Sequence, residues 1–314
     1  MNNWFLYAIT VLIWGTTWIA IEFQLGEVSP AVSVCYRYAL ASLMLFAWCR
    51  FRNLQLTFDR HAHGLFLLLG ALLFSINYIV TYYAQEYITS ALTAIAFSTM
   101  LWMNIFNSRI FFGTRAGVSV IAGSVLGVIG ILFLFLPEVR TISLEDASFL
   151  GASLAVLGAF VASLGNMVSQ AAQERRLPIL QSNAWGMLYG AAITGVIAVL
   201  QGKPFVIDQS ASYLLSLAYL SIFGSIVAFG SYLTLLGRIG AHRAGYAVVM
   251  FPVVAIIVSV LFEGLVLTMD MMIGVALVLL GNFLILRTGR KSAPHEPSQA
   301  LSRRALGYVV EKLR

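Results

Sequence analysis

Polar and aromatic side chains recur at helical spacing inside long apolar stretches of the chain. Within residues 64–84, four of them fall on one face of a helix, namely Asn77, Tyr78, Thr81 and Tyr82. The same residue types recur in other apolar stretches, at Trp14, Thr17, Trp18, Trp102, Asn104, Asn107, Asn166, Gln170, Asn183, Trp185, Tyr189, Ser231 and Tyr232. Rings and amides around a common space bind amphipathic molecules, and ring faces attract ammonium groups.

Each of these side chains also has a structural interpretation. Amides and hydroxyls hold apolar helices together through hydrogen bonds, and Trp or Tyr near the end of a membrane span anchors it at the interface. That role is the ordinary one for any single residue. For the set, we expect three or more to line a cavity, to which five rings contribute, those of Trp14, Tyr78, Tyr82, Trp102 and Trp185.

Few ionisable residues lie in or beside the apolar stretches. Arg37 is seven residues past Pro30, which places it about 10 Å along a helix. It is a candidate site for a carboxylate or phosphate, unless it pairs with an acid or extends to the interface. Glu22, Glu86 and Glu263 stand at predicted span ends, where a half-shielded carboxylate could exchange a proton and couple transport to a proton gradient. The simpler interpretation is that they are solvated or cap helices.

Pro252 is a further candidate for a moving part. It removes one backbone hydrogen bond from its helix, so the resulting kink is either a hinge or a packing feature. The four histidines lie in predicted connections or in the tail, and no metalloprotease, phosphate-loop or clustered-cysteine motif occurs. We therefore expect no catalytic residue, no metal and no cofactor, and the protein is predicted not to be an enzyme.

The composition indicates which kind of structural element positions these residues. Residues of the hydrophobic set make up 60% of the 314-residue chain and charged residues only 10%, against about 25% charged in soluble domains. An all-α integral membrane protein follows, with ten segments near the length that crosses a bilayer. They are 4–21, 30–49, 64–84, 89–108, 116–136, 148–172, 179–200, 211–236, 244–262 and 269–286.

The charges predict how these segments are oriented. Of the 19 Lys and Arg residues, 16 precede the first segment, occupy the even-numbered connections or follow the last segment. The odd-numbered connections hold two, Arg140 and Lys203, and Arg37 lies within a segment. The positive-inside rule then places both termini in the cytoplasm. The net charge of +6 is explained by orientation, so no nucleic-acid partner is expected.

The chain also contains an internal repeat. Gly123 and Gly130 are seven apart, as are Gly274 and Gly281, and the two pairs are offset by 151 residues. Five segments per repeat is an odd number, so the second repeat enters the membrane from the opposite side, as in many secondary transporters. We expect a first repeat at 1–140, a second at 146–288 and a basic cytoplasmic tail at 289–314. The tail is either a short amphipathic helix or disordered.

Several motifs resemble one family. Residues 12–18 read LIWGTTW, 36–41 read YRYALA, 82–91 read YYAQEYITSA, and 237–244 read GRIGAHRA, followed by FPV at 251–253 and FE at 262–263. They resemble the EamA-type transporters of the drug/metabolite transporter superfamily. The resemblance implies ten helices in two inverted EamA repeats, and export or exchange of small metabolites. In the first repeat, Leu101 replaces the proline and Phe112 the glutamate of the second.

The sequence therefore favours a multi-pass secondary transporter of the cytoplasmic (inner) membrane. It would export or exchange small organic metabolites, such as amino acids or similar amphipathic solutes, by alternating access, with protons as a candidate coupling ion. The candidate cavity residues are Trp14, Thr17, Arg37, Asn77, Tyr78, Tyr82, Trp102, Asn166, Trp185 and Tyr189. The alternatives are an uncoupled facilitator, a non-transporting membrane scaffold and an intramembrane enzyme. The sequence leaves the oligomeric state open.

Overall fold

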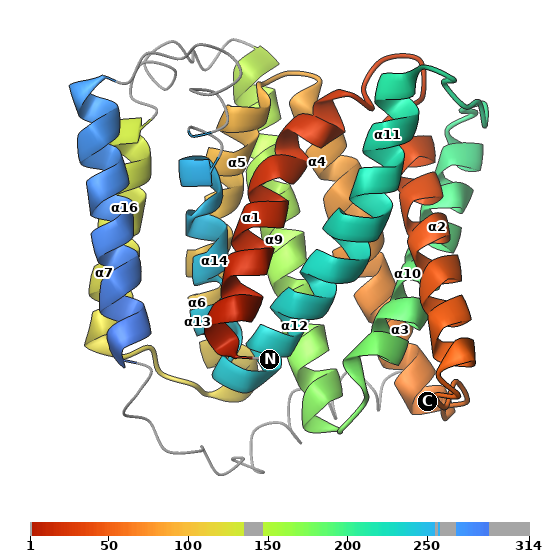
Figure 1. The fold of residues 1–314 in the computed structure, drawn as a ribbon, viewed down its shortest axis with the longest axis horizontal. Helices are drawn as coiled ribbons and strands as arrows, with labels where there is room; N and C mark the ends of the chain where they lie inside the picture. The colour runs from red at the N-terminus through yellow and green to blue at the C-terminus, as the bar shows by residue number, and fades with distance from the viewer. Residues whose placement is uncertain (1, 135–146, 255–256, 258–267, 289–314) are drawn as a thin grey trace.

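The computed structural model describes residues 2–134, 147–254, 257 and 268–288, and within these ranges it contains helices and no strand (Figure 1). The first repeat comprises α1 (Asn3–Glu22), α2 (Pro30–Phe51), α3 (Arg60–Ala71), η1 (Leu72–Ile76), α4 (Asn77–Gln85), α5 (Ser90–Ser98), α6 (Met100–Phe112) and α7 (Val118–Leu134). The second comprises α9 (Ala147–Glu174), α10 (Ile179–Leu200), α11 (Ala211–Tyr219), η2 (Leu220–Val227), α12 (Ala228–Ile239), α13 (Ala241–Ala244), α14 (Tyr246–Val249) and α16 (Met269–Thr288).

Local signals in the sequence explain where these helices begin and end. The Asp59 side chain accepts a hydrogen bond from the Ala62 amide at the start of α3, and Ser210 caps α11 through the Tyr213 amide. Pro30 occupies the first turn of α2, where its missing N–H is not needed. Gly113 ends α6 in the left-handed conformation, with φ of 67°, which glycine adopts without strain.

Six helical stretches are long and apolar enough to cross a membrane, and they agree with six of the predicted segments. They are Asn3–Glu22, Pro30–Phe51, Arg60–Gln85, Ala147–Glu174, Ile179–Leu200 and Ala211–Ile239. Shorter apolar helices occupy the predicted segments that end each repeat. The predicted segment 89–108 is broken at Thr99, and the predicted segment 244–262 begins as the short helices α13 and α14. The total of ten spans stays a prediction.

Two of the long stretches contain a π-helical section that the sequence pattern did not predict. η1 interrupts the third predicted segment and η2 the eighth. Their first residues, Leu72 and Leu220, are 148 residues apart, the same offset as between Pro30 and Pro178. Corresponding helices of the two repeats thus carry the same irregularity, and such π-sections are frequent at functional sites.

The helix that ends each repeat packs against its counterpart, and α7 and α16 lie side by side (Figure 1). A Cβ on Gly130 would lie 2.7 Å from the carbonyl oxygen of Gly274, and a Cβ on Gly281 would lie 2.5 Å from that of Gly123. Each glycine of the predicted pair in one repeat therefore meets the non-equivalent glycine of the other. Antiparallel packing of the two equivalent helices produces this crossed pattern. Each contact then occurs twice, with the two repeats exchanged, as across a two-fold axis.

Hydrogen bonds place the connections at two ends in the predicted alternation. The Arg238 guanidinium, at the end of α12, donates to the Asn3 side chain at 3.1 Å, so the N-terminus and the eighth predicted connection share one end. At the other end, the Tyr83 hydroxyl in the last turn of α4 donates to the Gln201 side chain, just after α10, at 3.3 Å. The third and seventh connections therefore begin at the same end of the bundle. Which end faces the cytoplasm stays a prediction of the charge count. The predicted tail 289–314, the boundary at 140–146 and Glu263 lie outside the described residues.

Candidate substrate cavity

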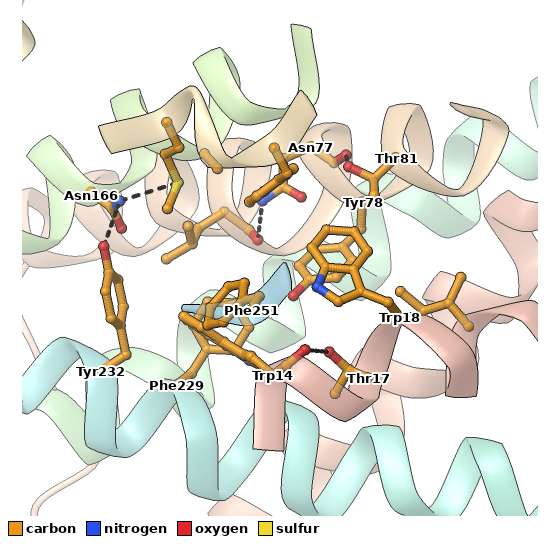
Figure 2. A pocket seen from close by; sticks show the side chains of 15 residues that line it. Trp14, Thr17, Trp18, Asn77, Tyr78, Thr81, Asn166, Phe229, Tyr232 and Phe251 are labelled. Atoms are coloured by element: carbon orange, nitrogen blue, oxygen red, sulfur yellow. Dashed lines mark hydrogen bonds between the residues drawn. The ribbon is translucent and has the colours of Figure 1, made fainter. Parts of the chain in front are cut away.

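A cavity lies at the centre of the bundle, where helices of both repeats meet (Figure 2). α1, η1, α4, α5 and α6 line it from the first repeat, and α9, α12 and the stretch that begins at Phe251 line it from the second. Five of the predicted cavity residues line it, namely Trp14, Thr17, Asn77, Tyr78 and Asn166. Trp18, Thr81 and Tyr232, from the same polar and aromatic stripes, do so as well.

One wall of the cavity is a cluster of aromatic rings around Trp14. The Trp14 ring lies 4.7 Å from Phe229, 4.9 Å from Tyr232 and 5.8 Å from Phe251, measured between centroids. Its indole N–H donates to the carbonyl oxygen of Gly224 in η2 at 3.0 Å. This bond ties α1 to the π-section of the other repeat and fixes the ring that faces the cavity.

At one end of the cavity, an amide and a phenol connect three helices (Figure 2). The Asn166 amide nitrogen donates to the Tyr232 hydroxyl at 3.0 Å and to the Asn104 side-chain oxygen at 3.3 Å. The Asn166 oxygen and the Asn104 nitrogen are buried without a hydrogen-bond partner. Buried amide groups of this kind are costly unless something else pairs with them. Of the two, the Asn166 oxygen belongs to a residue that lines the cavity, so it is the unpaired acceptor at this end.

A second cleft lies beyond that end, along the same two helices. It is lined by Gln170, Gln173, Glu174, Ile179, Thr234, Leu236, Gly237, Arg238 and Gly240. Gln170 follows Asn166 by one helical turn on α9, and Leu236 follows Tyr232 by one turn on α12. The second cleft sits at the end that holds Asn3, because Arg238 bonds to that residue. The Asn166–Tyr232 bond thus stands between the central cavity and that end.

Arg37 lies beside the cavity and does not line it. Its side chain is fully buried, and its Nε donates to the Ser225 hydroxyl in η2 at 2.9 Å. The guanidinium carbon is 4.5 Å from the centre of the Tyr78 ring and 5.2 Å from that of Tyr38. Since Tyr78 lines the cavity, its ring separates the arginine from the central space.

Four other predicted cavity residues are not among the residues that line this cavity, namely Tyr82, Trp102, Trp185 and Tyr189. Tyr82 is fully buried and donates to the Gln24 side chain at 2.8 Å. Trp102 stands two positions after Met100, which does line the cavity, and residues two apart point to different sides of a helix.

Trp185 and Tyr189 of α10 form a cluster with His63 instead of joining the cavity. The His63 Nδ1 and the Tyr189 hydroxyl are 2.9 Å apart, and the His63 ring lies 4.7 Å from Trp185. The Trp185 indole donates to the carbonyl oxygen of Leu56 at 3.1 Å. His63 lies in the first turn of α3 and not in a connection, as the sequence had suggested. These contacts therefore attach α3 and the connection before it to α10, which is a packing role.

The described acids that were coupling candidates lie at one end of the bundle, away from the cavity lining. Glu22 closes α1 and Glu86 follows α4, and both are exposed. Partial loss of hydration raises the pKa of Glu86, and the positive charge of Lys203 opposes that shift. Pro252 is buried and follows Phe251, a cavity residue, and the helix is interrupted at Met250 just before it. The predicted kink therefore coincides with a real break.

The cavity also contains residues that sequence reasoning missed. Ile21, Leu73, Phe97, Met100, Ala162, Phe229 and Phe251 complete its lining. They are apolar residues in apolar segments, so no contrast in residue type sets them apart. Among the described residues, no group of three His, Cys, Asp or Glu side chains could hold a metal ion.

Apolar helices that cross a bilayer and enclose a cavity between two repeats are the architecture of a multi-pass membrane transporter. The model of the EamA-like transporter family matches the chain twice, over residues 3–136 and 149–287, and the protein belongs to that family. The double match confirms the family resemblance and the two repeats predicted from the sequence.

Proteins from several bacteria are similar to this chain over most of their length. The chain is 22% identical to the uncharacterized transporter YoaV of Bacillus subtilis, over 87% of this chain and 92% of that protein. It is 22% identical to protein PagO of Salmonella typhimurium, over 90% and 91%. The uncharacterized inner membrane transporter YedA of Escherichia coli is 24% identical, over 81% and 80%. One solved crystal structure shares the fold, with a TM-score of 0.74 over 91% of this chain and 97% of that chain, at 18% identity.

Proposed function

We propose that the protein is a secondary active transporter that exports or exchanges small organic metabolites, amino acids or similar amphipathic solutes, across the cytoplasmic membrane by alternating access. One observation carries the proposal. The central cavity is built by both repeats, and its lining combines aromatic rings with the amides of Asn77 and Asn166. In transporters made of inverted repeats, the substrate site lies near the midplane between the repeats.

The chemistry of the lining favours an amphipathic solute. Rings such as Trp14, Trp18 and Phe229 would cover its apolar part, while amides and hydroxyls at both ends would orient its polar groups. The lining residues include no Lys, Arg, Asp, Glu or His in the part of the chain that the structure describes. Sugar phosphates and nucleotides are poor candidates, since their phosphates require several cations.

The test is counterflow into proteoliposomes. Vesicles that contain the purified protein would be loaded with one unlabelled solute and offered trace amounts of the same labelled solute outside. Amino acids, amines and sugar phosphates would be compared in parallel, with empty vesicles as the control. Accumulation of a labelled amphipathic solute supports the proposal. Accumulation of none of them, with the protein correctly inserted, contradicts it.

An uncoupled facilitator is the second candidate, and one observation favours it. Glu22 and Glu86 lie outside the cavity lining, so neither carboxylate shares the space in which a substrate would sit. A facilitator needs no such group. Imposing a pH gradient on the same vesicles separates the two candidates, because proton coupling drives a substrate above its equilibrium concentration and a facilitator does not.

A further inference from the structure

Arg37 carries the one buried charge beside the central cavity that the described residues leave without an anionic partner. Its side chain is 0% exposed. Its Nε hydrogen-bonds Ser225, and the two terminal nitrogens, Nη1 and Nη2, are buried without an acceptor at hydrogen-bond geometry in the described ranges. The neutral Tyr82 hydroxyl also lies within reach of the guanidinium. The arginine therefore holds a full positive charge inside the bundle, and its two terminal nitrogens have no anionic acceptor among the described residues.

The surroundings of Arg37 compensate for this charge only in part. No Asp or Glu of the described chain forms an ion pair with it, and the rings of Tyr38 and Tyr78 contact the guanidinium through their faces. Ring faces attract a cation, but they satisfy none of its N–H donors. Removing an unpaired charge from water is expensive, and the cost is offset when an anion with good hydrogen-bond geometry joins it.

The two terminal nitrogens are close to the cavity and separated from it by one side chain. Tyr78 stands second in α4, directly after η1, and its ring both contacts the guanidinium and lines the cavity. On the other side, Gly224 packs closely against Nη2, because a Cβ there would lie only 3.2 Å from that nitrogen. Rotation of the Tyr78 side chain would connect Nη1 and Nη2 with the central space.

We propose that Arg37 is the anchor for a substrate carboxylate, which displaces the Tyr78 ring and accepts hydrogen bonds from Nη1 and Nη2. This inference rests on the proposed function, because it assumes that the central cavity holds the substrate. The guanidinium fork matches the two oxygens of a carboxylate. A single arginine balances a monoanion, whereas a phosphate dianion would leave a net buried negative charge. The substrate class is thus an organic monocarboxylate whose apolar body lies among the rings around Trp14.

The test compares two probes of nearly equal shape, phenylacetate and phenylacetamide, on the purified full-length protein. Binding is followed by the fluorescence of the cavity tryptophans and, independently, by the shift in melting temperature. We expect the wild-type protein to bind phenylacetate about tenfold or more tightly than phenylacetamide, since a hydrogen-bonded charge contributes that much. Arg37→Gln should abolish this preference, and Arg37→Lys should weaken it because the fork is lost.

A matched control separates recognition from a structural role. The Ser33 hydroxyl, one turn before Arg37 on α2, hydrogen-bonds the Tyr213 hydroxyl at 3.0 Å, so it joins the same two long helices away from the cavity. Ser33→Ala should lower stability and leave the preference for phenylacetate intact. If Arg37→Gln does not fold, the wild-type preference and its reduction in Arg37→Lys decide the matter.

Equal binding of the two probes by the wild-type protein, including no measurable binding of either, would overturn the inference. So would an unchanged preference in a folded Arg37→Gln variant. Failure of the proposed function looks different. A protein that takes up amines by counterflow and shows no preference for phenylacetate is a transporter without this anchor. If the protein prefers phenylacetate but moves no solute, the inference about Arg37 stands and the proposed function is wrong.

Discussion

The Asn166 amide of α9 donates to the Tyr232 hydroxyl of α12, and this bond separates the central cavity from a second polar cleft one helical turn further along both helices. If the proposed alternating access opens the cavity toward this cleft, the two side chains have to part. The bond therefore joins two elements whose relative movement the proposed function needs.

Tyr232→Phe removes one partner of that bond and should affect both stability and transport. Without the hydroxyl, the buried Asn166 amide loses one hydrogen-bond acceptor, which should lower the free energy of unfolding by about 1–3 kcal/mol. Tyr219→Phe is the control, since its hydroxyl bonds Thr16 at 2.6 Å outside the cavity lining. Detergent melting and counterflow are measured for both variants. Equal effects on counterflow would show that the Asn166–Tyr232 bond has no special place in transport.

Gly130→Ala should disrupt the contact between the two repeats. The added Cβ would approach the Gly274 carbonyl oxygen at 2.7 Å, and Val278 atoms lie as close. Forcing extra atoms into a packed contact typically costs about 1–3 kcal/mol. Gly117→Ala, just before α7, meets nothing within 4 Å and should be nearly neutral. Similar melting temperatures for the two variants would contradict the close glycine packing.

Trp14→Phe and Trp185→Phe should separate a cavity tryptophan from a packing tryptophan. The first change removes the indole that bonds the Gly224 carbonyl beside the cavity, so it should lower the counterflow rate severalfold with insertion unchanged. The second removes the bond to Leu56 and should mainly lower the melting temperature. A larger loss of counterflow from Trp185→Phe would restore the role that the sequence predicted for it.

Glu86→Gln should change the pH dependence of stability and leave transport intact. The raised pKa of Glu86 means that the folded protein disfavours the ionised form. Its penalty is absent below the unfolded-state value, grows as the pH rises through the raised value, and is complete above it. The variant should therefore melt slightly higher than wild type at neutral pH and equally at low pH. Loss of pH-gradient-driven uptake in this variant would instead identify Glu86 as a coupling group.

Reporter fusions should settle the orientation. A reporter active only outside the cytoplasm should stay silent when it is fused after Arg290, and should be active when it is inserted at Gly202 in the connection after α10. The charge count motivates both outcomes, because 16 of the 19 Lys and Arg residues fall on the side of the tail. The reverse pattern would mean that the predicted orientation is inverted.

The sequence predicted those parts of the fold and the cavity that differ from their surroundings in residue type. Trp14, Asn77 and Asn166 were found because polar or ring-bearing residues contrast with an apolar helix. Phe229 and Phe251 carry no such contrast, so only packing reveals them. Trp185 is the same type of residue in the same kind of apolar segment as Trp14. Nothing in the sequence indicates that the carbonyl oxygen of Leu56, more than a hundred residues earlier, accepts a hydrogen bond from its indole N–H.

Features of the backbone were a second part of the structure that the sequence could not predict. The glycine pairs at 123 and 130 and at 274 and 281 indicated a repeat, but their crossed contacts depend on a two-fold relation that only coordinates display. η1 and η2 were not predicted, because a π-section changes the hydrogen-bond partner of a few amides and leaves the apolar pattern almost untouched.

The π-helical hydrogen bonds of η2 determine which of its backbone carbonyls are available to side chains. The Ala228 amide donates to the carbonyl of Phe223, five residues back, so the Gly224 carbonyl receives the Trp14 indole instead of a backbone amide. The next residue, Ser225, holds Arg37 and donates to the Leu220 carbonyl. If this section relaxed to ordinary α-helical spacing, the Ala228 amide would compete with Trp14 for Gly224, and the turn that carries Ser225 would rotate. A shift of one hydrogen-bond register would thus change the contacts of Trp14, in the cavity wall, and of Arg37, the buried cation, at the same time.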